Sequence, residues 1–306
     1  MKHSGQIILV TGATGTQGGA TARELLAAQY RVRVLTRNPG SPQASALAAR
    51  GAEIVKGDMD APDTLVAAMQ GAHGVFSVQR PAAMDSDSER RHGRALIEAA
   101  LRSSVRHFVH TSVCEAGKHT DFPRWSTGYW YQKYWTDKWD VEQAVREAGF
   151  PLWTVLRPAF MMDNCARPKA QSMFPHLRSG RILTALLPET HLQLIAADDV
   201  GAFAKAAFMN SAQFNRKNID LAAEALTMSK VAAILSQQLH RTVRAESVSP
   251  RAAREAGIFP GWARTQEWIN EVGYRADIGA LKAYGIALTS FTEWVQRHAG
   301  EIDIET

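Results

Sequence analysis

A tyrosine and a lysine lie four residues apart, at Tyr134 and Lys138, within a stretch that has a helical pattern. Residues at this spacing project from one face of a helix. A lysine beside a tyrosine can lower the pKa of the phenol, which suits the tyrosine to acid–base chemistry. Ser112 follows the strand-like segment 107–110 and could orient a substrate carbonyl. Together the three residues could orient and protonate a carbonyl oxygen.

Two members of this set also have plainer interpretations. Tyr134 could be one more aromatic residue in a tryptophan-rich region, where helix packing is the commoner use of such side chains. Lys138 could form an exposed ion pair with Glu142 on the same helix. The tryptophans could instead line a pocket, and they are Trp125, Trp130, Trp135 and Trp139.

A glycine run near the N-terminus is the element that would place a cofactor beside these residues. The apolar segment 7–10 precedes Gly12, Gly15 and Gly18, and a helical pattern runs over 20–28. In a strand–turn–helix unit, the first glycine makes the tight turn and the second lets backbone approach phosphates. The third lets the helix pack against the strand. The first amides of such a helix attract an anion, so the run predicts a dinucleotide site whose nicotinamide could help to lower the pKa of the tyrosine.

The choice of dinucleotide depends on the end of the second predicted strand. NAD sites usually carry an acidic residue there, which binds the ribose 2′-hydroxyl. The segment 32–35 is instead followed by Thr36, Arg37 and Asn38, without a carboxylate. The guanidinium of Arg37 suits a 2′-phosphate. The sequence therefore predicts NADP(H) rather than NAD(H), although Arg37 could also be an ordinary surface arginine in a turn.

Two residues after the third predicted strand are candidates for binding adenine. Asp58 could accept a hydrogen bond from the adenine amino group, while Met59 packs against the ring. Alternatively, Asp58 is a turn residue that caps the helix beginning near Pro62.

Strand and helix patterns alternate through the first half of the chain, which predicts right-handed crossovers and a parallel sheet. We expect an α/β fold: a Rossmann-type doubly wound parallel sheet with a smaller, interleaved C-terminal α+β lobe. The Rossmann domain would span 1–158, with a return at about 190–222, and the lobe would span 159–189 and 223–306. The six expected strands of the first domain are 7–10, 32–35, 53–55, 74–78, 107–110 and 152–156.

Composition excludes several other classes of protein. The 306 residues are 45% hydrophobic and 21% charged, with a net charge of +5, which is ordinary for a globular protein. There is no basic block with interleaved aromatics and no apolar run of about 18 residues, so neither nucleic acid nor membrane is expected as a partner. Two cysteines give no zinc spacing or disulfide framework, so we expect a reducing cytoplasm and no metal. The histidines are expected to be structural.

The same residues resemble a known family, the NmrA-like family of atypical short-chain dehydrogenases/reductases. The resemblance covers nearly the whole chain and includes the segments 11–19, 36–39, 57–58, 138–139, 156–160 and 197–201. It implies an NADP-binding Rossmann domain and a small lobe. It further implies that Phe160 lies near the nicotinamide and that Gln79 follows the fourth strand. The remaining implied cofactor ligands are Thr14, Thr16, Gln17 and Gly18 at the pyrophosphate, Arg37 at the 2′-phosphate, Asp58 and Met59 at the adenine, and Lys138 at the ribose.

The resemblance leaves two functions open. Some members of the family reduce quinones or carbonyl compounds, whereas others bind the dinucleotide and regulate a protein partner as redox sensors. Many members carry histidine at the position of Tyr134, so the tyrosine favours an NADPH-dependent reductase of a small carbonyl or quinone substrate. Met173 and Phe174 are candidates for the outer wall of its pocket. The oligomeric state stays open.

Overall fold

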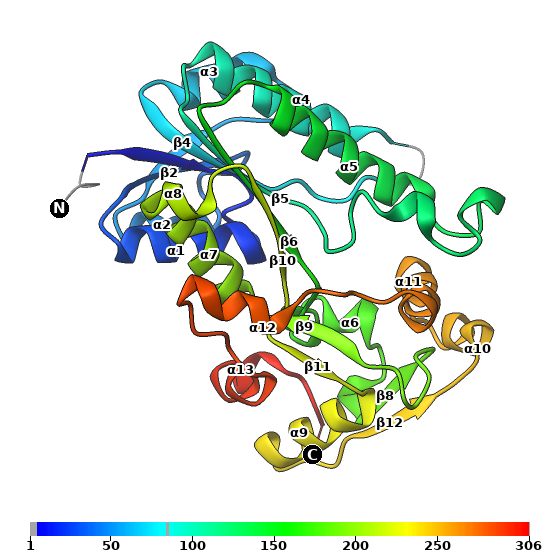
Figure 1. The fold of residues 1–306 in the computed structure, drawn as a ribbon. Coiled ribbons are helices and arrows are strands. Elements are labelled where there is room, and N and C mark those ends of the chain that lie inside the picture. Colours follow the sequence, from blue (N-terminus) through cyan, green and yellow to red (C-terminus); the bar gives the residue numbers. More distant parts are fainter. Residues whose placement is uncertain (1–4, 84–85, 306) are drawn as a thin grey trace. The chain divides into compact units, whose positions relative to one another are not determined.

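The computed structural model describes residues 5–83 and 86–305, and Figure 1 traces the chain through its elements. The chain divides into two compact units. Unit 1 comprises the described part of Met1–Gly117 together with Lys133–Pro158 and Ala197–Asp220. Unit 2 comprises Lys118–Gln132, Ala159–Ala196 and the described part of Leu221–Thr306.

Unit 1 is built on a seven-stranded sheet with the order β10-β6-β5-β4-β1-β2-β3. Every neighbouring pair from β6 to β3 is parallel. The order 3-2-1-4-5-6 within it is that of doubly wound dinucleotide-binding sheets, and the switch point lies between β1 and β4. The strands are β1 (Ile7–Val10), β2 (Arg31–Thr36), β3 (Glu53–Lys56), β4 (Ala72–Ser77), β5 (His107–Thr111), β6 (Leu152–Pro158) and β10 (Lys217–Leu221).

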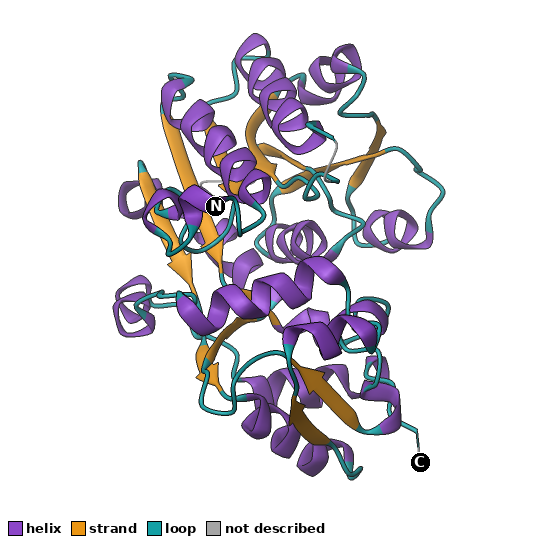
Figure 2. Ribbon diagram, turned by 90° about the vertical axis from the view of Figure 1, so that its right-hand side faces the viewer, coloured by secondary structure: helices purple, strands orange, loops and turns teal. Residues whose placement is uncertain are grey.

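Helices cover both faces of this sheet, as the purple coils and orange strands of Figure 2 show. On one face, Leu65, Leu96 and Val145 from three helices share a core with Leu9 and Phe108 from the strands. On the other face, α1 and α7 pack so closely that a Cβ at Gly201 would overlap the backbone of Ala20. The helices are α1 (Thr16–Ala27), α2 (Pro42–Ala48), α3 (Pro62–Met69), α4 (Ser88–Arg102), α5 (Gln132–Glu147), α7 (Ala197–Met209) and α8 (Ser211–Phe214).

Unit 2 is a mixture of short helices with two small sheets, ordered β11-β9-β7 and β12-β8. Its strands are β7 (Phe160–Met161), β8 (Arg181–Thr184), β9 (Leu192–Ile195), β11 (Glu224–Leu226) and β12 (Arg244–Ser247). Its α-helices are α6 (Ala170–Met173), α9 (Met228–Leu239), α10 (Pro250–Glu255), α11 (Pro260–Glu271), α12 (Ile278–Leu281) and α13 (Phe291–His298). Its 3₁₀ turns are His119–Asp121, Trp125–Thr127, Met162–Cys165, Leu177–Ser179, Lys282–Tyr284 and Ala299–Glu301.

The expected fold class is confirmed, and so is each of the six expected strands to within two residues at either end. One expectation was wrong in detail. The first helix begins at Thr16 rather than Ala20, because glycines do not prevent a helix that packs well on its sheet.

None of the helices in the described part of the chain combines the length and the apolar character that a membrane span requires.

Candidate functional site

The turn between β1 and α1 has the close approaches that its glycines predict. Gly12 has a φ of 60°, in the left-handed region that favours glycine. A Cβ at Gly18 would fall far inside van der Waals contact of the backbone of Gly12 and Thr11, so only glycine lets α1 lie this close to the turn. Gly15 is the N-cap of α1, and its amide donates to the Gly12 carbonyl at 2.9 Å.

The N-terminus of α1 is open to an anion. Its N-cap has no side chain to cap the first amides, and its first turn contains no acidic residue. These amides have no partner within the helix, and the positive end of the helix dipole lies there. Gly12, Thr14 and Gly15 are exposed beside them, while Thr16 and Gln17 are partly buried. The residues of this turn therefore fit a dinucleotide pyrophosphate.

Hydrogen bonds fasten this turn to the neighbouring strand ends. Thr11 Oγ1 accepts from the amide of Val78 at 2.9 Å, which joins the ends of β1 and β4 at the switch point. Thr111 Oγ1, at the end of β5, donates to Gln17 Oε1 of α1 at 2.8 Å. Gln79 Nε2 donates to Ser77 Oγ at 2.8 Å. Gln17 and Gln79, which the resemblance implies as cofactor ligands, thus lie at the carboxyl edge of the sheet, where doubly wound folds bind ligands.

Arg37 follows β2 as an exposed side chain. Among the described residues it forms no ion pair or hydrogen bond through its guanidinium. Asn38 and Ser41, beyond it, are engaged in turn and cap hydrogen bonds. The guanidinium is thus available for a phosphate group, and no carboxylate at the end of β2 competes with it.

Asp58 acts in the turn that follows β3. Its Oδ1 accepts from the amide of Asp60 at 3.1 Å. Asp58 is thus a turn residue, as the alternative had it, but it does not cap α3, whose N-cap is Ala61 without a side-chain hydrogen bond, so the capping part of that alternative was wrong. Met59 is partly buried against the apolar core of unit 1. Both residues lie near the surface beside β3, and their predicted contact with adenine stays a prediction.

Lys138 is buried on α5 rather than exposed. Its Nζ donates to Oε1 of Glu89, at the start of α4, over 2.7 Å. The two side chains are 8% and 4% exposed. Glu142, the alternative partner of Lys138, instead forms an ion pair with Arg157 at 2.6 Å. The exposed Lys138–Glu142 pair was therefore wrong, because both side chains are buried with other partners.

Tyr134 lies one helical turn before Lys138 on α5. The Lys138 ammonium is 5.2 Å from the centroid of the Tyr134 ring. Burial, and secondarily the negative charge of Glu89, raises the pKa of Tyr134 above its usual value. This is opposite to the lowering expected from Lys138, because burial penalises the phenolate and Glu89 counteracts the lysine. Tyr134 therefore keeps its proton and can donate a hydrogen bond.

Ser112 immediately follows β5 and is buried, with 6% of its surface exposed. Its amide donates to the Leu156 carbonyl at 2.8 Å, but its hydroxyl has no partner among the described residues. Buried hydroxyls usually have one. Ser112 shares no hydrogen bond with Tyr134 or Lys138, so the structure joins only two members of the predicted triad, Tyr134 and Lys138, through the contact of the ammonium with the ring.

His110 belongs to the same region of unit 1. Its Nδ1 is 3.3 Å from Ser77 Oγ. Burial, aided by the charge of Lys138, lowers the pKa of His110 to about 3. His110 is thus neutral, in agreement with a structural role.

The predicted tryptophan cluster is divided between several packing contacts. Trp139 lies against Gly117 and near Arg146 and Arg157 in unit 1. Trp125 packs against His119 in unit 2. Trp135 meets Tyr134 edge to face at 5.3 Å.

Phe160 lies in unit 2 with Met173 and Phe174, whereas the other predicted cofactor ligands and the predicted catalytic residues lie in unit 1. It stacks on Trp262 with the ring centroids 4.5 Å apart, and Phe174 meets both rings edge to face. Trp262 Nε1 has no partner in the part of the chain that the structure describes. Met173 is partly buried beside Phe174. Unit 2 therefore contains an aromatic cluster around Phe160.

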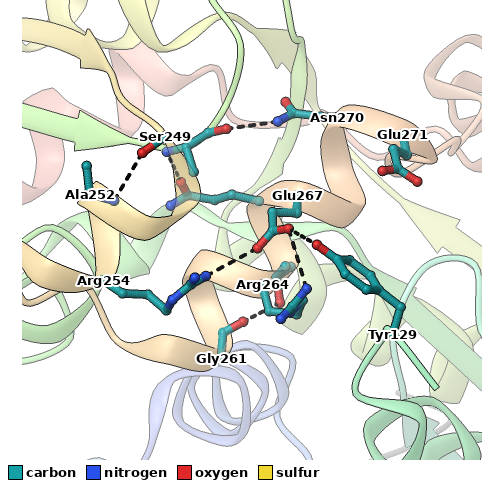
Figure 3. A network of polar contacts seen from close by, with 12 residues as sticks. Tyr129, Ser249, Ala252, Arg254, Gly261, Arg264, Glu267, Asn270 and Glu271 are labelled. Atoms are coloured by element: carbon teal, nitrogen blue, oxygen red, sulfur yellow. Dashed lines mark hydrogen bonds and ion pairs between the residues drawn. The ribbon is translucent and has the colours of Figure 1, made fainter. Parts of the chain in front are cut away.

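A polar network in unit 2 holds the segment 118–132 against α11. Tyr129 donates to Glu267 Oε2 at 2.5 Å (Figure 3), and Arg254 and Arg264 each approach the same carboxylate at 3.4 Å. The guanidinium of Arg124 stacks over the Tyr129 ring at 3.7 Å. The segment 118–132 is thus anchored to α11 by specific charged and aromatic contacts.

Sequence reasoning missed Glu89 and Trp262. A signal for Glu89 exists, since it lies four residues before Gly93 and seven before Leu96, on the buried face of α4. A carboxylate on an apolar helix face needs a partner, which Lys138 supplies. Trp262 has no comparable signal, because an aromatic residue on a helix is ordinary in a core.

Cys114, Glu115 and Asp220 have ligand atoms within 4.8 Å of one another. The Arg157 guanidinium lies 3.9 Å from Asp220 and supplies a positive charge to this group, so the cluster does not require a metal.

Comparisons with known proteins agree with this architecture. The chain is 31% identical to an NAD(P)H azoreductase of Xenophilus azovorans, over 96% of this chain and 98% of the relative. The NADPH-dependent quinone oxidoreductase QOR2 of Escherichia coli, solved with NADPH, has a similar fold with a TM-score of 0.74, 22% identity and coverage of 95% and 99%. NmrA, a negative transcriptional regulator solved with NADP, gives a TM-score of 0.75 at 19% identity over 98% and 97%. The family model for the NmrA-like family matches residues 4–294, and the chain belongs to this family.

Proposed function

We propose that this protein is an NADPH-dependent reductase of small quinone or carbonyl compounds. The observation that carries the proposal is the open turn from Gly12 to Gly18 at the end of β1, which fits a pyrophosphate. Similarity over the whole chain to an azoreductase supports reduction rather than binding alone. NADPH, when bound, supplies the hydride.

Different residues of unit 1 would bind the successive parts of the dinucleotide. The α1 amides and Thr14, Thr16 and Gln17 would bind the pyrophosphate. Arg37 would bind the 2′-phosphate through its guanidinium fork. Asp58 and Met59 would meet the adenine, and Lys138 would donate to the ribose. Gln79, at the end of β4, would lie beside the nicotinamide half.

Two hydroxyl groups would act on the substrate. Ser112 has a buried hydroxyl without a partner, which could donate to a substrate oxygen. Tyr134 keeps its proton and would donate a hydrogen bond to the oxygen on which negative charge develops.

A regulatory function is the second candidate. The raised pKa of Tyr134 is less suited to catalysis than the lowered value expected from the sequence, and NmrA has a similar fold. In this alternative the protein would bind NADP(H) and report the redox ratio to a protein partner without reducing a substrate. Cys114 and Cys165 are both buried and form no disulfide in the described part of the chain, which supports a reducing, cytoplasmic location for either function.

Replacing Arg37 with alanine should reduce the preference for NADPH over NADH by about 10- to 100-fold, because one charge-assisted phosphate contact is lost. Affinity for NADH should change little. Titration of both cofactors by their fluorescence measures the two dissociation constants. An unchanged ratio of the two constants would remove Arg37 from the 2′-phosphate site.

Replacing Tyr134 with phenylalanine tests the chemistry. NADPH oxidation against a panel of quinones, azo dyes and carbonyl compounds should fall in Tyr134→Phe by about 10- to 100-fold in kcat, because general-acid assistance is lost. NADPH affinity should stay near that of the wild type. Turnover that survives the substitution would mean that another group or solvent supplies the proton. Tight NADPH binding without turnover of any acceptor would favour the regulatory function.

A further inference from the structure

We propose that Glu89 is a positioning residue, which holds the Lys138 ammonium in place for the ribose of the bound cofactor. The inference rests on the proposed function, because it assigns Glu89 a task at the same cofactor site. Its basis is the buried contact of 2.7 Å between Glu89 at the start of α4 and Lys138 on α5.

The packing of α4 on α5 does not depend on this ion pair. A Cβ added at Gly93 would clash with the Val141 side chain, so the two helices already meet closely through apolar groups. Leu96 and Val145 join the same continuous core. A buried ion pair is often no more stabilising than hydrophobic side chains of similar size. Its presence in an apolar helix interface therefore points to a positional role.

The other carboxylates of α5 near Lys138 are paired with other cations, so Glu89 is the carboxylate that binds the Lys138 ammonium. On α5, Asp137 pairs with Lys133, and Glu142 pairs with Arg157 and Arg146. Among the described carboxylates, Glu89 alone binds Lys138. A carboxylate in the first turn of α4 is itself favoured by the helix dipole, which fixes the acceptor end of the contact.

The ammonium keeps donors for a ligand. Lys138 has three N–H groups, and Glu89 is its one hydrogen-bond partner within the described chain. The Tyr134 ring lies at 5.2 Å on one side. Anchoring one donor to a carboxylate limits the rotation of a long side chain, so less entropy is lost when ribose binds. Glu89 would therefore act on the cofactor through Lys138 without contacting it.

A double-mutant cycle in NADPH affinity tests this proposal. We would measure the NADPH dissociation constant by fluorescence titration for the wild type, Glu89→Gln, Lys138→Met and the double variant. Glu89→Gln should raise the NADPH dissociation constant by about tenfold, as expected for loss of one buried charge-assisted contact. In the Lys138→Met background, Glu89→Gln should weaken binding no further, because Glu89 acts only through Lys138.

Glu142→Gln is the matched control. It removes another buried carboxylate that pairs with a cation of unit 1, and it lies on the same helix as Lys138. Urea unfolding should show a loss of stability in both Glu142→Gln and Glu89→Gln, whereas NADPH affinity should fall only in Glu89→Gln. Equal losses of affinity in the two variants would overturn the proposal, since they would reflect general destabilisation.

Two further results would overturn it: a wild-type dissociation constant in Glu89→Gln, or full additivity of the two losses in the double variant. If Glu89→Gln does not fold, Glu89→Asp tests the same point, because it keeps the charge but withdraws it by one methylene. Its NADPH affinity should fall by a few-fold, and a wild-type value would count against positioning. Failure of the reductase proposal is distinguishable, because it appears as NADPH binding by the wild type without turnover.

Discussion

Replacing Gly18 with alanine is expected to abolish tight NADPH binding. The added methyl group would overlap the backbone atoms of Gly12 and Thr11, which cannot rotate away as a flexible side chain could. Either α1 moves off the sheet or the turn changes shape, at a cost of about 1–3 kcal/mol in the free energy of unfolding. NADPH affinity should fall by about 100-fold or more, because the amides no longer converge on the pyrophosphate. Urea unfolding and fluorescence titration measure the two effects.

Gly300→Ala is the control for this substitution. A Cβ added at Gly300 would have no atom within 4 Å, and the φ of Gly300 is not positive. The stability and NADPH affinity of Gly300→Ala should therefore match those of the wild type. A Gly18→Ala variant that binds NADPH as tightly as Gly300→Ala would show that the cofactor does not use this turn.

Acidification is expected to destabilise the protein through two buried histidines. Burial, with a smaller effect of His73, lowers the pKa of His107 to about 3, and His110 has a similarly lowered pKa. The unfolded chain therefore binds protons below pH 6.5 that the folded chain excludes. The stability of the folded protein that depends on neutral His107 and His110 is fully present above the pKa that histidine has in the unfolded chain. It is lost as the pH falls below that value. Between about pH 7.5 and about pH 5 the loss should be about 2 kcal/mol for each histidine.

His107→Gln isolates one of these contributions. His107 packs edge to face on Phe208 at 4.9 Å, and its Nε2 has no partner among the described residues. Glutamine cannot be protonated, so the stability lost between the two pH values should be smaller than in the wild type by about 2 kcal/mol. His191→Gln, at an exposed position, should keep the wild-type loss. Equal losses in all three proteins would show that His107 is not held neutral by burial.

The sheet of unit 1 was predictable because its signals are local. The apolar run 7–10, the glycines after it and the helical pattern that follows are read directly from neighbouring residues. The return of β10 to the sheet was also predictable from its apolar pattern. Unit 2 was less predictable, since its strands have two to four residues and depend on distant partners.

The candidate site divides along the same line. The roles proposed for Gly12, Gly18 and Arg37 follow from their positions along the chain; the close approaches at the two glycines and the exposure of Arg37 are compatible with them. The environment of Tyr134 did not follow, because burial, which is the main cause of its raised pKa, comes from tertiary packing, and Glu89, which adds to the rise, is 45 positions away in the sequence. Sequence spacing shows which residues share a helix face, but burial and partners from another helix determine their protonation.

The most direct test of the central claim is a single turnover with NADPH that carries deuterium at the transferring carbon of its nicotinamide. Enzyme would be mixed with this NADPH and a quinone or azo acceptor, and oxidation followed by absorbance. We expect the acceptor to be reduced in proportion to the NADPH oxidised, and more slowly with the deuterated cofactor than with ordinary NADPH. Tight binding of NADPH with no oxidation across the acceptor panel would contradict the reductase account.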